Sequence, residues 1–329
     1  MIPVIIDLRF LTLLILLAPN LGWTGFHSGP HRDYWEYHAK MNEVENHISD
    51  ERFGDALNLL DEIVGTYDFV FLRAYKIGAQ LALHLGEQDK AFLYIKEGIG
   101  AGWDLKSLEN EPYLSRLKRE PEWKAMEQAY PALHDQYLQR LDPAVRKEVR
   151  EMFKRDQRKA MGALLRMGDK AREKYAHETF APQSEEHMMR LIEMLDNPGY
   201  PGEKLIGNNF WASTILSHHN SISQDYVQRD TLYRHVRPLL LRSLGTGQMS
   251  PYEFALAEEW QIAVSSNRSA PGYGYLDPPR QSTLDETNEL RKKIGLRTVE
   301  LRNELIEVEN KTGMDFHLPD WIEGKIEIE

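Results

Sequence analysis

Two stretches of the sequence repeat each other at a shift of 35 residues. Residues 51–65 read ERFGDALNLLDEIVG and residues 86–100 read GEQDKAFLYIKEGIG, with small, large and large apolar residues at positions i, i+4 and i+8 of both. The matched pairs are Ala56 with Ala91, Leu57 with Phe92, Leu60 with Ile95, Glu62 with Glu97, Val64 with Ile99, and Gly65 with Gly100. This spacing predicts two amphipathic helices, each stopped by its glycine. Helical periodicity continues nearly everywhere from His38 onward and runs of alternating β-branched residues are scarce, so we expect an all-α protein.

The segment between the two copies, residues 69–86, is also helical in pattern. Its small residues Gly78, Ala79 and Ala82 would let a neighbouring helix approach closely. Together these helices resemble tetratricopeptide-type repeats, whose period is about 34 residues. The resemblance is to a degenerate form, with one and a half to two repeats over about residues 35–105 and without the aromatic-rich consensus. It implies a helical-repeat domain with a cap over residues 35–130.

The cap is the segment of residues 100–126, which resembles the part that often closes such arrays in bacterial exported proteins. Its apolar anchors are Trp103, Leu105, Leu108, Leu114, Leu117 and Trp123. Exposed tryptophans would indicate a ligand clamp, whereas buried ones indicate a cap. Because tryptophan is highly buried on average, we expect the cap.

A second helical region is predicted after residues 130–143, where the composition becomes polar and is punctuated by proline. We place the domain boundary in this stretch, near residue 135, with Asp142 and Pro143 as the start signal of the next helix. Periodicity then predicts helices over 143–165, 185–195, 208–219, 226–245 and 250–266, in a helical domain at 142–280.

Residues 281–329 are predicted to form one long charged helix and an acidic tail. The apolar residues on one face of this helix are Leu290, Ile294, Leu301, Leu305 and Val308. Thr312 and Gly313 end it, because glycine is the usual residue just after a helix.

The composition of the 329-residue chain excludes several classes of partner and chemistry. Acidic residues outnumber basic ones by 51 to 40, which gives a formal charge of −11 and disfavours nucleic acid and anionic membrane surfaces as partners. The chain has no cysteine, which excludes disulfides, thiolate metal sites and a cysteine nucleophile. We expect no cofactor.

The amino terminus predicts export. Arg9 precedes the apolar run from Phe10 to Ala18, whose length suits the core of a signal peptide better than a membrane span. Asp7, Pro19 and the lack of a clean cleavage site leave an uncleaved anchor or a first core helix as alternatives. We interpret residues 1–24 as a signal peptide or anchor and expect a periplasmic or secreted protein. No later stretch is apolar for long enough to span a bilayer, so we expect no integral span in the mature chain.

The motifs of the well-marked enzyme classes are missing. The sequence has no HExxH, G-x-S-x-G, GxxxxGK[ST] or EF-hand pattern. Gly272 and Gly274 in GYGYLD lack a third glycine and a following helix, so they are a weak nucleotide-binding signal.

The adjacent histidines His218 and His219 end one of the predicted helices. Helical geometry places His219 on the face of Ala212, Ile215 and Leu216, and turns His218 about 100° away from it. The two cannot bind the same ion, so a metal site would need one of them with other ligands. The candidates for those ligands are Asp156, His187, His235 and Glu259. The alternative is that His219 points inward and is hydrogen-bonded at the helix end, with His218 solvated.

Asp156 falls within the apolar stripe of its helix and needs a partner, because burying a lone carboxylate is costly. Arg158 or Gln157 could supply it locally, or a histidine from another helix could do so. An Asp156–His219 pair would orient the imidazole for acid–base chemistry, or would pin two helices together.

Residues 147–275 resemble an uncharacterised family of bacterial helical domains that often follow tetratricopeptide-like repeats. The matching motifs are Asp156-Gln157-Arg158, the turn from Gly199 to Gly207, the helix-ending His219 (or His218), and Tyr273-Gly274. The family usually has Thr-Gln after the Tyr-Gly loop and an Asp-Arg pair in the preceding helix, whereas this chain has Tyr275-Leu276 and AEEWQ. The resemblance implies a shared fold and pocket, but no reaction.

Two hypotheses about function follow from these patterns. The first, which we favour, is a non-enzymatic protein of the bacterial cell envelope that binds a peptide or protein partner on its helical repeats. The second is a hydrolase-like enzyme in the second domain. In that enzyme His219 would be the general base, Asp156 would orient it, and Arg158 or the loop around Tyr273 would stabilise an anion.

Overall fold

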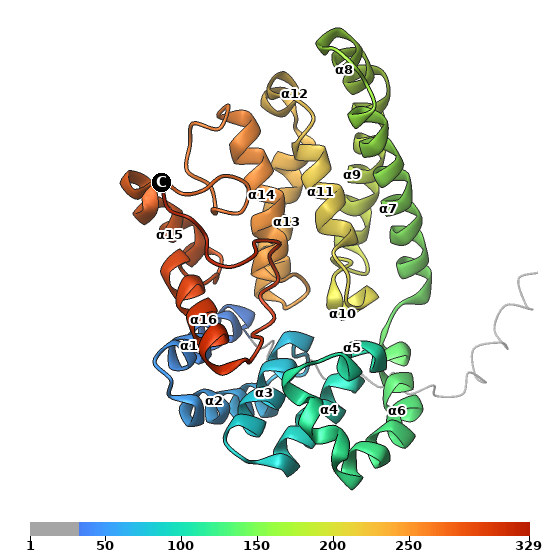
Figure 1. Ribbon diagram of the computed structural model, residues 1–329. Helices are drawn as coiled ribbons and strands as arrows, with labels where there is room; N and C mark the ends of the chain where they lie inside the picture. The colour runs from blue at the N-terminus through green and yellow to red at the C-terminus, as the bar shows by residue number, and fades with distance from the viewer. Residues whose placement is uncertain (1–32) are drawn as a thin grey trace, which may run out of the picture. The chain divides into compact units, whose positions relative to one another are not determined.

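The computed structural model describes residues 33–329, which form helices and loops with no β-strand among them (Figure 1). The prediction of an all-α fold is confirmed. Arg32–Glu329 is one compact unit. The predicted signal peptide at residues 1–24 lies outside the described residues. Within residues 33–329, no helix combines the length and the apolar character needed to cross a membrane.

The first helices along the chain pack on one another as a helical stack. The helices of this stack are α1 (Tyr34–Ser49), α2 (Phe53–Thr66), α3 (Leu72–His84), α4 (Gln88–Gly100) and α6 (Pro121–Arg140). Each successive pair from α1 to α4 is in contact, and α6 packs on α4. The two copies of the 35-residue repeat are α2 and α4. Gly78 on α3 lets α4 approach, since a Cβ atom there would lie 2.3 Å from the Tyr94 ring.

The predicted cap is built from α5 (Leu105–Glu109) and a 3-10 helix (Tyr113–Arg119). Trp103 and Trp123 are 1 % and 4 % exposed, and Leu108, Leu114 and Leu117 are fully buried. Leu105 is only half-buried. The tryptophans are therefore anchors of the core, as expected for a cap. The polar stretch at 130–143 contains no linker near residue 135, because α6 continues to Arg140 with Pro131 on its exposed side.

The middle of the chain forms a second group of helices around a second core. Its helices are α7 (Pro143–Leu164), α8 (Asp169–Tyr175), α9 (Ala181–Asp196), α10 (Glu203–Ile206), α11 (Trp211–Asn220), α12 (Gln224–Arg229), α13 (Leu232–Gly245) and α14 (Pro251–Ser265), with a π-helical turn at Ala176–Phe180. Asp142 caps α7 as predicted, and its side chain accepts hydrogen bonds from Ala144 N and Val145 N. The single helix expected over 226–245 is two helices, because Asp230 is extended and caps α13 through Leu232 N and Tyr233 N.

The predicted long helix at the carboxyl end is wrong. After a 3-10 turn at Gln281–Thr283 the chain forms two helices, α15 (Leu284–Lys293) and α16 (Val299–Thr312). Gly295 ends the first with φ of +75°, a left-handed conformation that side chains other than glycine rarely adopt. Thr298 caps the second by accepting a hydrogen bond from Leu301 N. Gly313 ends α16 in the left-handed conformation, as predicted.

The segment after α16 joins both cores. Met314 and Phe316 are buried in the first core with the helical stack, whereas Ile326 is buried in the second. Helix α16 also packs on α1, so the first and the last helix of the described chain are side by side (Figure 1).

Candidate functional site

Asp156 on α7 meets His218 rather than His219. The Asp156 side chain is buried and its Oδ2 pairs with His218 Nδ1, while His218 is half-buried with 25 % of its side chain exposed. His219 points inward, is 1 % exposed, and pairs through Nε2 with Asp230 Oδ2 at 3.0 Å. The expected Asp156–His219 pair is therefore replaced by two separate pairs. The alternative prediction, that His219 points inward and is hydrogen-bonded, is confirmed. The same prediction placed His218 in solvent, whereas His218 is half-buried and paired with Asp156.

The second oxygen of Asp156 faces a residue that the sequence analysis missed. Lys159 Nζ lies 2.9 Å from Asp156 Oδ1, and it also donates a hydrogen bond to Ser184 Oγ. Burial alone would raise the pKa of Asp156, but the hydrogen bond and charge of His218 and the charge of Lys159 outweigh it and hold that pKa below its usual range. Ser184 and Lys159 are 1 % and 2 % exposed. The pairs thus form a largely buried polar network between α7, α9 and α11.

Arg158 and Tyr273 do not join this network. Arg158 is exposed on α7 and lines a separate cavity of about 310 Å³ with Lys159 and His187. Tyr273 is 2 % exposed, and its backbone carbonyl accepts a hydrogen bond from Arg291 Nη1. The residues predicted as one catalytic set are therefore divided among separate contacts.

The glycine loop that was expected to stabilise an anion already holds a carboxyl group of the chain. Glu259 on α14 accepts hydrogen bonds from Gly274 N at 3.0 Å and from Tyr275 N at 3.1 Å. These backbone amides are thus occupied by the chain's own carboxylate. Within residues 33–329, the predicted metal ligands Asp156, His187, His235 and Glu259 form no common group.

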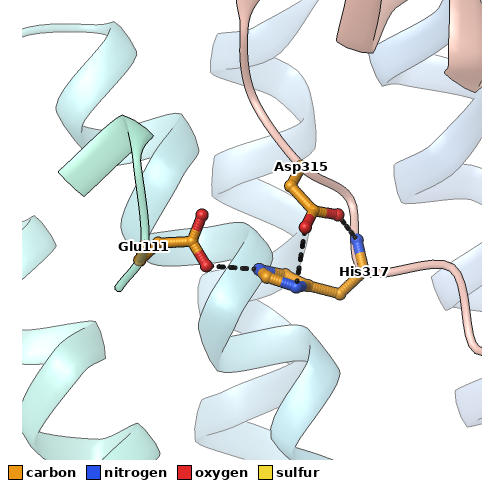
Figure 2. Close-up of side chains that lie close together, drawn as sticks. All are labelled: Glu111, Asp315 and His317. Carbon is orange, nitrogen blue, oxygen red and sulfur yellow. Dashed lines mark hydrogen bonds and ion pairs between the residues drawn. The ribbon is translucent and has the colours of Figure 1, made fainter. Parts of the chain in front are cut away.

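A different group has the composition of a metal site. Glu111, which follows α5, and Asp315 and His317, which follow α16, place one potential ligand atom each within 4.8 Å of one another. Figure 2 shows the imidazole between the two carboxylates, with Nε2 3.6 Å from Glu111 Oε2 and Nδ1 3.4 Å from Asp315 Oδ2. Burial raises the pKa of Glu111 to about 7 and lowers that of His317 to about 4.

The hydrogen bonds of Gln80 argue against a metal ion at this group. Its amide is fixed by the backbone of Asp315, since Nε2 donates to the carbonyl at 2.6 Å and Oε1 accepts from the N–H at 2.8 Å. The same Nε2 lies 3.0 Å from His317 Nε2, and an amide nitrogen can only donate. The lone pair of His317 Nε2 is therefore used, and the proton of the ring is on Nδ1, facing Asp315. The group is better described as a hydrogen-bonded junction between the helical stack and the carboxyl-terminal segment.

A further candidate site is a cavity of about 390 Å³, here called the Glu45 cavity. It is lined by α1 and α3 of the stack, by the α10–α11 and α13–α14 connections, and by the segments before and after α16. Most of its surface is apolar, and the residues responsible include Tyr37, Met41, Phe71, Phe210, Tyr252 and Leu296. Phe210 is 45 % exposed and contacts Tyr252, with ring centroids 5.6 Å apart.

Charged groups gather at one part of this cavity. Glu45 on α1 is 1 % exposed and pairs with two arginines, Arg73 on α3 and Arg297 before α16. Burial would raise the pKa of Glu45, but these two guanidinium groups outweigh it and keep the pKa below its usual range. Glu45 is therefore ionised at neutral pH, and it fixes both arginines from one side.

Two further carboxyl groups, those of Glu203 and Glu253, line the same cavity and differ from Glu45 in their protonation. Glu203 accepts a hydrogen bond from Leu72 N at 2.7 Å, and Glu253 caps α14 and accepts one from Tyr200 Oη at 3.1 Å. Burial raises the pKa of each to about 7. Both groups are therefore largely uncharged below pH 7, so they do not cancel the positive charge of the arginines there.

Comparison with known proteins identifies no relative, because no protein-family model, curated protein or solved structure matches this chain. The two resemblances drawn from the sequence therefore stay predictions. Function has to be argued from the geometry and chemistry of the sites.

Proposed function

We propose that this protein is a non-enzymatic binding protein, and that a small amphipathic organic molecule occupies the Glu45 cavity. The observation that carries the proposal is the cavity itself. Its volume of about 390 Å³ falls in the usual range for small-molecule sites. Its lining, mostly apolar with a few charged groups at one part, is the composition that such sites share. Partly apolar ligands gain binding energy when this surface is removed from water.

The exposed ring of Phe210 supports the same proposal. A large apolar side chain that is 45 % exposed at the edge of a cavity can cover a bound ligand. A peptide partner on the repeat helices, the other binding mode that we considered, has less support, because the cavity draws its lining from both groups of helices. The hydrolase hypothesis also has less support, since His219 pairs with Asp230 and the loop amides are bound by Glu259.

A neutral fluorescent probe tests this function. We expect N-phenyl-1-naphthylamine to bind the protein with an increase in fluorescence. Leu72→Trp should weaken this binding by about tenfold or more, which corresponds to about 1.4 kcal/mol. Leu72 is half-buried and lines the cavity, so the larger indole would fill part of the space. The matched control is Leu59→Trp, at a half-buried position of α2 outside the cavity lining.

The measurement is a fluorescence titration of both variants and the wild type, with circular dichroism to confirm that each is folded. Failure of the wild type to bind the probe would refute the proposal. Equal binding by the Leu72→Trp and wild-type proteins would place the probe elsewhere and would also refute it.

A further inference from the structure

The arginines of the Glu45 cavity have unused hydrogen-bond donors. Arg73 Nη1 and Arg297 Nε contact the two oxygens of Glu45 at 2.5 and 2.6 Å. Arg73 Nη2 and Arg297 Nη1 are buried and have no hydrogen-bond partner within the described part of the chain. Arg297 as a whole is 7 % exposed. Within the described residues, two charged donors of arginines that line the Glu45 cavity are thus left without acceptors.

Such donors are costly unless an acceptor reaches them. A buried polar group without a hydrogen bond destabilises the folded protein, and a buried charged group does so more strongly. Arg73 Nε already donates to the carbonyl oxygens of Phe316 and His317 at 2.9 and 3.1 Å, so this side chain is fixed on two sides. Arg73 Nη2 and Arg297 Nη1 are therefore held in fixed positions, and no acceptor from residues 33–329 reaches them.

The charge balance selects the kind of acceptor. Two guanidinium groups and the ionised Glu45 carboxylate leave one positive charge on this group. Lys76 also lines the cavity, and Glu203 and Glu253 are largely protonated below pH 7. A monoanion balances the charge of the Glu45, Arg73 and Arg297 group, whereas a cation or a neutral molecule leaves that charge unbalanced. Guanidinium groups bind carboxylates with short, charge-assisted hydrogen bonds.

We propose that the ligand of the Glu45 cavity is an amphipathic monocarboxylic acid whose carboxylate accepts hydrogen bonds from Arg73 Nη2 and Arg297 Nη1. Its apolar part lies against Phe71, Tyr252 and the other apolar residues of the lining. Glu45 is a positioning residue, since it orients both arginines and does not touch the ligand. This inference rests on the proposed function and adds the chemical class of the ligand.

Matched acids and alcohols test the class of ligand. Decanoate and decan-1-ol have the same alkyl chain and differ in the group that would meet the arginines. In competition with N-phenyl-1-naphthylamine, decanoate should displace the probe at a concentration about 10- to 100-fold lower than decan-1-ol does, the difference expected for charge-assisted hydrogen bonds. An aromatic pair, 4-phenylbutyrate and 4-phenylbutan-1-ol, shows whether the preference follows the carboxylate or the alkyl chain.

Arginine-to-lysine variants separate recognition from structure. Arg73→Lys and Arg297→Lys keep the charge that pairs with Glu45 but each removes one of the two free donors. Each single variant should therefore reduce the preference for decanoate over decan-1-ol, and the double variant should bring their displacement concentrations close to equal. Arg52→Lys, at an exposed position of the stack, should leave this preference unchanged. If acid and alcohol compete equally with the wild type, the inference is wrong while the proposed function stands. If the probe itself does not bind, the proposed function fails first.

Discussion

Glu45 and Glu203 show how two carboxyl groups of one cavity reach opposite ionisation states. Glu45 contacts two guanidinium groups, whose charge outweighs the cost of burying the carboxylate. Within residues 33–329, Glu203 accepts a backbone hydrogen bond from Leu72 N, but burial dominates and raises its pKa to about 7. The arrangement of neighbours, and not burial alone, decides the charge of the site.

The raised pKa of Glu203 predicts how stability depends on pH. Between the ordinary pKa of a glutamate and about 7, the folded protein retains the Glu203 proton that the unfolded chain has released. The free energy of unfolding therefore falls as pH rises through this interval. Glu203→Gln removes this titration. We expect the wild type to lose about 1–2 kcal/mol of stability relative to Glu203→Gln between pH 5 and pH 8.

Urea denaturation of the two proteins at both pH values measures this difference. Glu122→Gln, on the exposed surface of α6, is the control and should show the same pH dependence as the wild type. A constant difference between wild type and Glu203→Gln from pH 5 to pH 8 would show that Glu203 titrates normally.

At the level of single residues, the sequence allowed only part of the site to be predicted. The 100° rotation per residue correctly separates His218 from His219, and it places His219 inward. Which histidine reaches Asp156 depends on where α7 lies relative to α11, and this is a tertiary property. Lys159 could have been found, because it lies three residues after Asp156 on the same helical face. The Glu45–Arg297 pair joins residues 252 positions apart, and no local pattern indicates it.

At the level of elements, the break between α15 and α16 positions Arg297, one of the two arginines that pair with Glu45. Arg297 lies in the short connection between these helices, and a continuous helix would carry it elsewhere. The apolar period from Leu290 to Val308 continues across the break, so periodicity alone predicts one helix. The stop and start signals were nevertheless present in Gly295 and Thr298, which end one helix and cap the next.

Substitution of Gly295 tests this element. Gly295→Ala should destabilise the protein for two reasons: φ is +75°, and the added Cβ would lie 2.7 Å from the Cβ atom of His38 on α1. Gly313→Ala is a matched control, because φ is +77° there and nothing lies within 4 Å of the added atom. The control should lose about 1 kcal/mol, the usual cost of a left-handed alanine. Gly295→Ala should lose at least about 1 kcal/mol more, since tight packing is also disrupted.

Chemical denaturation of both variants supplies the two free energies of unfolding. The same preparations can be titrated with N-phenyl-1-naphthylamine. Because Gly295 lines the Glu45 cavity, Gly295→Ala should also weaken probe binding, whereas Gly313→Ala should not. Equal losses of stability in the two variants would contradict the close contact between this turn and α1.

At the level of the whole molecule, one part of the chain links the two cores. Helix α16 supplies Val299 to the second core and Leu305 and Val308 to the first. The carboxyl-terminal segment repeats this division with Phe316 and Ile326. The all-α class could be predicted from helical periodicity. This link could not be predicted, because the segment has no regular structure and its apolar residues follow no helical or strand period in the sequence.

Deletion of residues 314–329 should uncouple the two cores. The deletion removes the fully buried Phe316 from the first core and Ile326 from the second. It also leaves Arg302 buried without Asp320, whose Oδ1 lies 2.7 Å from Arg302 Nη2. Loss of a buried phenylalanine costs about 3–5 kcal/mol, and an unpaired buried charge costs a similar amount. Together they should lower the Tm by at least about 10 °C.

Differential scanning calorimetry distinguishes coupled from independent cores. The wild type should unfold in one transition whose calorimetric and van't Hoff enthalpies agree, because α16 and the carboxyl-terminal segment belong to both cores. The deletion should give two transitions, since the second core loses Ile326 while the first loses Met314 and Phe316, and only the weaker connections through α16 and the α1–α13 contact are among those that remain. A shorter deletion of residues 327–329 keeps these buried residues and should retain one transition near the wild-type Tm. A single, unshifted transition in the longer deletion would mean that the segment contributes little to either core. Arg73 and Arg297 would then be held in place without it, by α1, α3 and the start of α16.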